Sequence, residues 1–215
     1  VIGEPTEMRV VQAHRGIASF ETVVAGRAGH SSEPDAGVNA IFAAASCIGA
    51  LANLAREDGH GKHAEERTTV NVGRIEGGTA VNIIAGHCRF LWECRSYDEA
   101  SAERLRSGLD TWARRELLPS LRAVAPEADV RTDPKVSAPP LLVLADSPAV
   151  AVALALSGQN GAESIAYASE AGLFQKAGVP AVVIGPGSVA QAHQPDEFVA
   201  VTQLELCLGF LRRLG

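Results

Sequence analysis

The first part of the chain alternates between two hydrophobic periods, and each change of period marks a predicted element. Residues 16–27 are rich in β-branched side chains with partial alternation, which is typical of a strand. After a turn at residues 33–35, apolar residues recur at helical spacing and predict a helix. The core stripe expected for this helix is Val38, Ile41, Phe42, Ala45, Ile48 and Ala52. A strand followed by a helix therefore begins the pattern.

Four later segments extend this pattern. Residues 68–75 and 82–95 are predicted to be strands joined by a Gly-Gly turn, and residues 128–136 resemble a closing strand. Residues 101–118 predict a second helix. Its expected stripe is Leu105, Leu109, Trp112 and Leu117. The order βαββαβ predicts a ferredoxin-like α+β plan, in which two helices cover one face of a four-stranded antiparallel sheet and the other face is open.

The pattern changes after Pro139 and Pro140. Residues 146–157 predict an alanine-rich helix, residues 181–184 a short buried strand, and residues 202–214 a final helix. The core stripe expected for the final helix is Leu204, Cys207, Leu208 and Leu211. These elements are α/β in style but too few to close a doubly wound sheet, so we expect them to be part of a larger domain.

Charge and composition exclude two classes of partner. Lys and Arg total 19 against 25 Asp and Glu, a net charge of -6, so no excess of positive charge is available for a nucleic acid. The longest strongly apolar run, residues 141–156 with a break at Asp146, is too short and interrupted to span a bilayer. The chain begins without an initiator Met or a signal peptide, which suggests that it starts within a longer protein.

The cysteines indicate a compartment. Cys47, Cys88, Cys94 and Cys207 form no C-x-x-C pair and lie in apolar stretches, where a free thiol acts as a small hydrophobic side chain. Packing in the core is therefore favoured over disulfides or a zinc site. A reducing cytoplasm is the setting that we expect.

Two polar residues near the start of the chain are candidates for chemistry. Glu4 lies between Gly3 and Pro5 directly after an apolar pair, where a carboxylate can be a rigid metal ligand or simply an exposed turn glutamate. His30 lies between a strand and a helix, where an imidazole can donate a hydrogen bond to an oxyanion or be an ordinary loop residue. The other histidines before position 100 lack partners at ligand spacing, so we expect them to be solvated or structural; they are His14, His60, His63 and His87.

Two further candidates lie close together near the C-terminus. Residues 185–190 match G-x-G-x-x-A, but the polar residues 191–197 argue against the helix that a dinucleotide site needs, so a loop along the substrate is favoured. His193 follows this loop, and a loop imidazole with acidic neighbours is suited to bind zinc. The sequence contains no serine-hydrolase elbow, phosphate-binding loop or zincin motif. Of the reaction classes considered, metal-assisted hydrolysis is therefore the one still open.

Five motifs, taken in order, resemble the M20 metallopeptidase family; they are residues 2–6, 29–34, 77–84, 169–172 and 185–197. The resemblance implies an enzyme with two zinc ions, or with cobalt, that forms a homodimer through a ferredoxin-like lid. Residues 11–136 would be this lid. Residues 1–10 would be a strand end of the catalytic α/β domain, and residues 137–215 its C-terminal part.

The resemblance also implies roles for individual residues. Glu4 and His193 would each bind one of the two metal ions. His30 would reach into the partner subunit's active site and bind the carbonyl oxygen in the tetrahedral transition state. Asn82 and Arg95 would contact the substrate, and the guanidinium of Arg95 is suited to grip a carboxylate.

The remaining expectations concern the substrate. Gly187 and Ser188 would lie beside it, and Glu170 would bind an amine. The implied reaction is hydrolysis of an N-acyl amino acid, foremost N2-acetylornithine to ornithine and acetate in arginine biosynthesis. Desuccinylation of succinyl-diaminopimelate, or another M20 amidohydrolase or carboxypeptidase activity, is the alternative within the family. A non-catalytic dimerisation module is the alternative outside it.

Two departures from the family pattern limit the expected activity. The His-x-Asp ligands and the Glu-Glu pair that supplies the general base have no counterpart in these residues, so we expect the chain alone to be inactive. Ser96 follows Arg95, where the family usually has proline.

Overall fold

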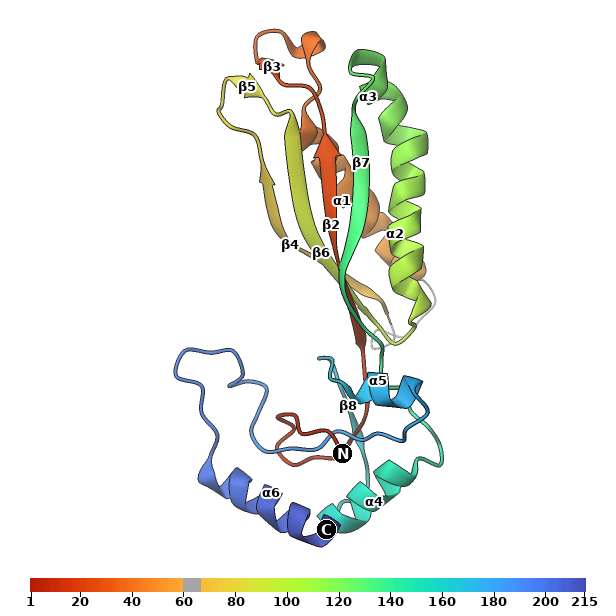
Figure 1. Ribbon diagram of the computed structural model, residues 1–215, viewed down its shortest axis with the longest axis vertical. Helices are drawn as coiled ribbons and strands as arrows, with labels where there is room; N and C mark the ends of the chain where they lie inside the picture. The colour runs from red at the N-terminus through yellow and green to blue at the C-terminus, as the bar shows by residue number, and fades with distance from the viewer. Residues whose placement is uncertain (60–66) are drawn as a thin grey trace. The chain divides into compact units, whose positions relative to one another are not determined.

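The computed structural model describes residues 1–59 and 67–215, and His60 and His63 lie outside these ranges. The chain divides into two compact units (Figure 1). Unit 1 comprises residues 1–16 and 138–215, and unit 2 comprises residues 17–137. We describe each unit by itself.

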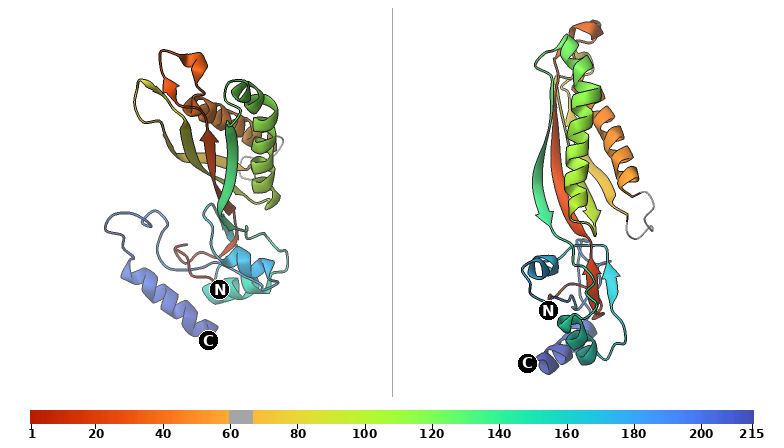
Figure 2. Two further views of the ribbon diagram at one scale, coloured as in Figure 1. Left: turned by 45° about the horizontal axis from the view of Figure 1, so that its top comes forward. Right: turned by 90° about the vertical axis from the view of Figure 1, so that its right-hand side faces the viewer.

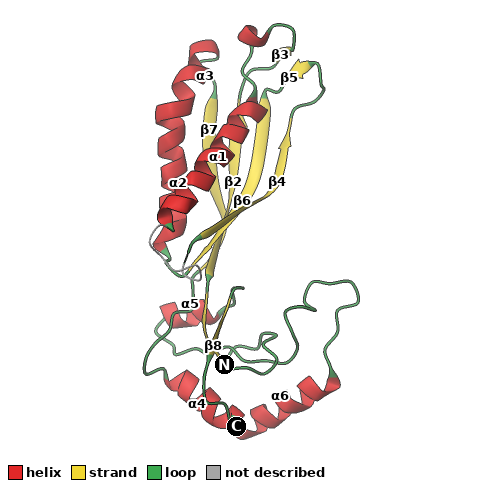
Figure 3. Cartoon of the chain, turned by 180° about the vertical axis from the view of Figure 1, so that it is seen from behind, coloured by secondary structure: helices red, strands yellow, loops and turns green. Residues whose placement is uncertain are grey.

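Unit 2 is built on a four-stranded antiparallel sheet. In sheet order its strands are β4 (Thr69–Gly77), β6 (His87–Ser96), β2 (Gly16–Ala25) and β7 (Asp129–Ala138). Two helices, α1 (Ala40–Asp58) and α2 (Ala100–Trp112), lie on the same face of this sheet (Figures 2 and 3). The α2 helix continues through a π-helical turn, Ala113–Leu117, into α3 (Leu118–Val124). The predicted ferredoxin-like fold class is confirmed.

The core of unit 2 follows from the period-2 pattern of β2 and β6. Alternate residues of both strands are buried under the helices, including Cys88 and Cys94, as predicted. The rings of Phe20 and Trp92 stack with their centroids 4.3 Å apart. Trp92 Nε1 donates a hydrogen bond to Thr22 Oγ1 at 3.0 Å, so the polar atom of this buried ring is satisfied.

The stripe predicted for α1 is wrong at most positions, although Val38 is buried and Ile48 packs against the core. The residues that face the core are mostly alanines, and they are Ala40, Ala43, Ala44, Cys47, Ala50 and Leu51. Phe42, which we expected in the core, is 73% exposed. Small side chains allow the helix to approach the sheet closely, so the larger apolar residues occupy the outer face. This helix is also the one described helix that is long and apolar enough to span a membrane, and its alanine-rich face packs on the sheet.

A second, two-stranded sheet in unit 2 was not predicted. The expected strand 82–95 is two pieces, because β5 (Ile83–Ile84) leaves the main sheet and pairs with β3 (Gly29–His30). The register places His30 opposite Ile83. A short 3-10 turn, Pro34–Ala36, follows β3. This pairing brings two motifs together that are about fifty residues apart in the sequence.

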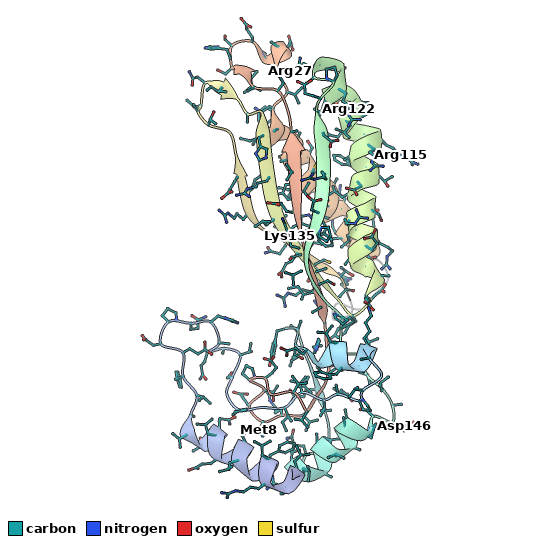
Figure 4. The ribbon with its side chains drawn as sticks, in the orientation of Figure 1. Met8, Arg27, Arg115, Arg122, Lys135 and Asp146 are labelled. Atoms are coloured by element: carbon teal, nitrogen blue, oxygen red, sulfur yellow. The ribbon has the colours of Figure 1, made fainter. Side chains whose placement is uncertain are left out.

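The open face of the sheet carries an ion-pair network. Glu21 pairs with Lys135 at 2.7 Å and with Arg89 at 3.3 Å, and Arg89 also pairs with Glu76 at 2.6 Å. Figure 4 labels Lys135 on β7. Charged cross-strand pairs give this face a polar surface that suits contact with solvent.

Unit 1 has less regular pairing. β1 (Val11–His14) is parallel to β8 (Glu163–Ile165) in a two-stranded sheet. The segment 181–184 is buried as predicted, but it makes isolated bridges, with Val183 opposite both Ile2 and Val11. The helices are α4 (Pro148–Ser157), α5 (Ala171–Lys176) and α6 (Val201–Leu214).

The stripe predicted for α6 is wrong at its leucines. Leu204, Leu208 and Leu211 are 45%, 48% and 51% exposed. The buried residue of α6 is Phe210, which packs in a small core with Met8, and the predicted Cys207 is partly buried against the same core. Figure 4 labels Met8. Because α6 has leucines on several sides, spacing alone does not identify the side that this small core covers.

Candidate functional site

Backbone contacts in unit 1 place the Glu4 segment against the glycine-rich loop. Thr6 N donates to Gly185 O at 3.3 Å, and Met8 N donates to the same oxygen at 2.9 Å. In return, Gly185 N donates to Thr6 Oγ1 at 3.1 Å. Glu7 N donates to Gly187 O at 2.7 Å. Glu4 is therefore fixed beside this loop by the main chain on both sides of it.

Glycine is required at the two glycine positions of this loop for different physical reasons. A Cβ added at Gly185 would lie 2.5 Å from Glu4 O, so a side chain there would displace Glu4. Gly187 has a φ of +86°, in the left-handed region that favours glycine. Ser188 forms a bridge with Thr6. Between this loop and α6 the structure has no helix among residues 189–199, as the polar residues 191–197 predict.

Glu170 and Tyr167 lie on the other side of Glu4. Burial raises the pKa of Glu4, and the negative charge of Glu170 raises it further. Tyr167 Oη donates to Pro5 O at 3.0 Å; burial raises the pKa of this phenol, and the charge of Glu4 adds to the effect. Within the described part of the chain, no N–H or O–H group donates to the Glu4 carboxylate. The half-buried carboxylate of Glu4 and the exposed carboxylate of Glu170 repel each other, and such a pair is suited to attract a cation.

His14 is buried near this candidate site, a position that we did not predict from the sequence. Its side chain is 0% exposed. Its Nδ1 lies 3.0 Å from Arg15 O, and Ser169 N donates to its Nε2 at 3.4 Å. Burial lowers the pKa of His14, so the ring is neutral near pH 7. His14 is thus structural, one of the two alternatives that we expected, and it contacts the residue before Glu170.

His193 lies on an exposed loop with unusual backbone. It has a φ of +61°, and Asp196 has a φ of +59°. Glu197 Oε2 accepts a hydrogen bond from the backbone N of His193 at 3.0 Å, so this acidic neighbour contacts the main chain and not the imidazole. No hydrogen bond among the described residues joins His193 to Glu4, and these residues contain no group of three or more metal-ligating side chains. The structure brings Glu4 close to Glu170 and the glycine loop, and His193 lies on the exposed segment that follows this loop.

In unit 2, the antiparallel pairing of β3 with β5 brings His30 and Asn82 together. Ser31 N donates to Asn82 O at 3.1 Å. His30 Nδ1 accepts a hydrogen bond from Ser32 N at 3.2 Å and lies 2.6 Å from Ser32 Oγ. Because Nδ1 is an acceptor, the proton of the neutral ring is on Nε2. The exposed His30 therefore presents an N–H donor, which is what stabilisation of an oxyanion requires.

Arg95 lies at the other end of the same sheet. It is opposite Thr69 in the β4–β6 ladder, whereas Cys88 is opposite Gly77 at the end of the sheet nearer to β5 in the sequence. At about 3.3 Å per residue, Cys88 and Arg95 are separated by about 23 Å. Arg95 Nε donates to Glu93 Oε1 at 2.9 Å. The predicted substrate residues of unit 2 thus fall into two groups at opposite ends of the sheet.

Known sequences include a matching family and several relatives of this chain. Residues 12–120 match the family model M20_dimer, described as a peptidase dimerisation domain. An acetylornithine deacetylase of Myxococcus xanthus is 38% identical over 99% of this chain and 56% of the relative. One from Photorhabdus laumondii is 34% identical over 93% of this chain and 51% of the relative. The chain spans about half the length of the curated relatives it matches.

Solved structures agree in fold. A tripeptidase of Staphylococcus aureus matches 98% of this chain and 54% of its own with a TM-score of 0.76 and 23% identity. An aminopeptidase of Bacillus cereus matches 97% of this chain and 55% of its own with a TM-score of 0.70 and 21% identity. At such identities the likeness concerns the fold alone.

Proposed function

Because the chain belongs to the M20 peptidase family, we propose that it carries the lid and part of the catalytic domain of a metal-dependent amidohydrolase. Unit 2 would be the lid, and unit 1 would belong to the catalytic domain. The observation that carries this proposal is the position of Glu4, half-buried between the glycine loop and Glu170 without a donor of its own among the described residues. A carboxylate in this position needs a positive partner.

The proposed positive partner of Glu4 is a metal ion. Carboxylate oxygen and imidazole nitrogen are both zinc ligands, so Glu4 fits one zinc ion and His193 another, with cobalt as an alternative. Such a metal centre supplies polarisation of the amide carbonyl and a bound water of lowered pKa. Two residues cannot complete two zinc sites. We therefore expect further ligands and the general base from outside these 215 residues, and no activity from the chain alone.

His30 would stabilise the oxyanion. Its Nε2 proton is directed by the two contacts of Nδ1 with Ser32, so the ring donates without a change of tautomer. His30 and Asn82 are at the end of the sheet where Cys88 lies and Arg95 is at the other end, about 23 Å from Cys88 along β6. One substrate cannot touch both groups of a single lid. In a homodimer both groups can contact substrate, because each lid would contribute its His30 and Asn82 to one active site and its Arg95 to the other.

The outer surface of unit 2 supports dimerisation through the lid. A groove of about 970 Å³ runs between α1 and the edge strand β4, and its lining combines apolar residues such as Ile48 and Val72 with polar residues such as Arg56 and Asn71. The edge strand has backbone groups available for another strand. A second copy of this surface would bury both, as the family model's description suggests.

The substrate that we propose is N2-acetylornithine, which would be hydrolysed to ornithine and acetate in arginine biosynthesis in the cytoplasm. Arg95 would bind the substrate carboxylate, Glu170 the side-chain amine, and Gly187 and Ser188 would line the path beside it. The names of the relatives from Myxococcus xanthus and Photorhabdus laumondii support this choice.

An assay of the full-length protein that contains this chain tests the proposal. We expect hydrolysis of N2-acetylornithine that stops when a chelator removes the metal and returns with zinc or cobalt. Faster hydrolysis of succinyl-diaminopimelate would keep the reaction class and change the substrate. A protein that dimerises but hydrolyses none of a panel of N-acyl amino acids would overturn the proposal in favour of a non-catalytic dimerisation module.

A further inference from the structure

We propose that His14 is a positioning residue for Glu170, so that a buried imidazole outside the reaction helps to select a substrate carrying an amine. The inference rests on the proposed function, because it assumes that Glu170 binds that amine. It adds a residue to which neither the family resemblance nor the comparisons give a role.

The first step is the hydrogen bonding of the ring. Arg15 O can only accept, so His14 Nδ1 carries the proton and donates to it at 3.0 Å. Nε2 is then an acceptor, and Ser169 N donates to it at 3.4 Å. Both nitrogens of this fully buried ring are therefore used. An apolar residue of the same size would leave the buried Ser169 N–H without this acceptor, which is unfavourable.

The second step is the local structure around Ser169. Its Oγ accepts a hydrogen bond from Ala171 N at 3.2 Å, which turns the chain into the short helix α5. Tyr167 Oη anchors the other side through Pro5 O at 3.0 Å. Behind Glu170, a Cβ at Gly172 would lie 2.2 Å from Pro139 O. The backbone on both sides of Glu170 is thus fixed at defined points.

The third step concerns Glu170 itself. Its side chain is exposed and has no hydrogen bond or ion pair among the described residues, so the backbone determines the region that the carboxylate can reach through the position of the Glu170 Cα. Ser169, whose N–H binds His14, is the residue immediately before it. A loss of that hydrogen bond would let the segment turn and move the carboxylate away from Glu4. His14 lies on the strand β1, which gives the anchor a rigid base.

Two variants of His14 in the full-length enzyme separate positioning from simple packing. His14→Gln keeps an acceptor and a donor, and His14→Met has a similar length with no donor and only a weak thioether acceptor. The substrates are N2-acetylornithine and N-acetylnorvaline, which has the same carbon chain without the amine. Glu170→Gln is the reference variant. We expect it to lower the preference for N2-acetylornithine, measured as a ratio of kcat/KM values, by about tenfold.

The expected result is that His14→Met loses most of that preference, His14→Gln keeps most of it, and His14→Met adds nothing further in the Glu170→Gln background. A loss of activity by His14→Met that is equal for both substrates, while Glu170→Gln abolishes the preference, would overturn the inference alone. No effect of Glu170→Gln would overturn the proposed role of Glu170 and the inference with it.

A measurement on the unmodified enzyme keeps the test independent of how the variants fold. Nitrogen-15 NMR of the histidine rings near pH 7 should show His14 as the neutral form with its proton on Nδ1. Amide exchange at Ser169 should be slow, and faster in His14→Met than in His14→Gln. A proton on Nε2 of His14 would contradict the arrangement from which the inference starts.

Discussion

The two units of this chain are stabilised in different ways. Unit 2 has a four-stranded sheet whose inner face is filled by aromatic and apolar residues under two helices. Unit 1 has one pair of regular strands, several isolated bridges, and a helix, α6, with exposed leucines. In unit 2 side-chain packing determines the fold, whereas in unit 1 the candidate site depends on close main-chain contacts around Glu4 and Gly185.

This difference matters for function. The candidate residues of unit 2, His30 and Asn82, lie in or beside the two-stranded β3–β5 sheet, in a unit that also contains the regular four-stranded sheet. The candidate residues of unit 1 are on loops, where a shift of one backbone segment changes the site. Stability and site geometry should therefore respond to different substitutions in the two units.

The largest expected effect is on the core of unit 2. Trp92→Ala removes a 2% exposed ring and its hydrogen bond to Thr22, and should lower the free energy of unfolding by about 3–5 kcal/mol. Denaturant titration followed by circular dichroism measures this. The matched control is Val81→Ala, because Val81 is 101% exposed and its loss should cost less than about 0.5 kcal/mol. A cost below that of the control would contradict a packed core.

The next effect concerns unit 1. Gly185→Ala should cost about 1–3 kcal/mol, because the new Cβ would lie 2.5 Å from Glu4 O. Gly161→Ala is the control, since nothing lies within 4 Å of a Cβ there. Amide exchange at residues 182–184 should accelerate in the first variant. Fluorescence of the two tryptophans, both in unit 2, should not change. Equal responses of both signals would remove the distinction between the units.

A smaller, pH-dependent effect is expected at Asp58. Burial alone would raise the pKa of this carboxyl group from 3.8, but hydrogen bonds from Thr68, Arg104 and Ser101 outweigh burial and lower the pKa to about 2. The charged form is thus favoured in the folded state. Its contribution, about 1–2 kcal/mol, is present above pH 4 and is lost as the pH falls towards 2. Unfolding of Asp58→Asn between pH 2 and 6 should lack this dependence, whereas Asp35→Asn, an exposed control, should retain it.

The smallest effect is expected on the open face of the sheet. Glu21→Gln removes the ion pairs with Lys135 and Arg89. Both partners are about half exposed, so the loss of stability should be smaller than for Asp58→Asn and should vanish in about 1 M salt. Thermal unfolding at low and high salt measures this. A loss that persists at high salt would indicate that the open face is covered in solution.

Sequence patterns predicted the order of elements in unit 2 because strand period and helix period differ sharply. The inward direction of Cys88, Phe90, Trp92 and Cys94 follows directly from alternation. The side of α1 that is buried was not predictable in the same way. Alanines and larger apolar residues lie on different sides of this helix, and close packing on the sheet selected the alanines.

The candidate site also has features that could be predicted from the sequence and features that could not. Glu4, Gly187 and Ser188 could be singled out because glycine and proline mark special backbone positions. The proximity of Glu170 to Glu4 and the contact of Ser169 with His14 join residues more than 150 positions apart, and no local pattern encodes them. The pairing of β3 with β5 was missed for a related reason, since two-residue strands carry no periodicity.

Subunit complementation in the full-length enzyme tests the central claim most directly. His30→Ala and Glu4→Ala are each expected to be inactive as homodimers. In a mixed dimer isolated by two different affinity tags, one site has its own Glu4 and receives His30 from the partner. We predict that this dimer regains about half of the wild-type kcat, because one of its two sites is intact. A mixed dimer no more active than the two parent variants would contradict the claim that the lid completes the active site of the partner subunit.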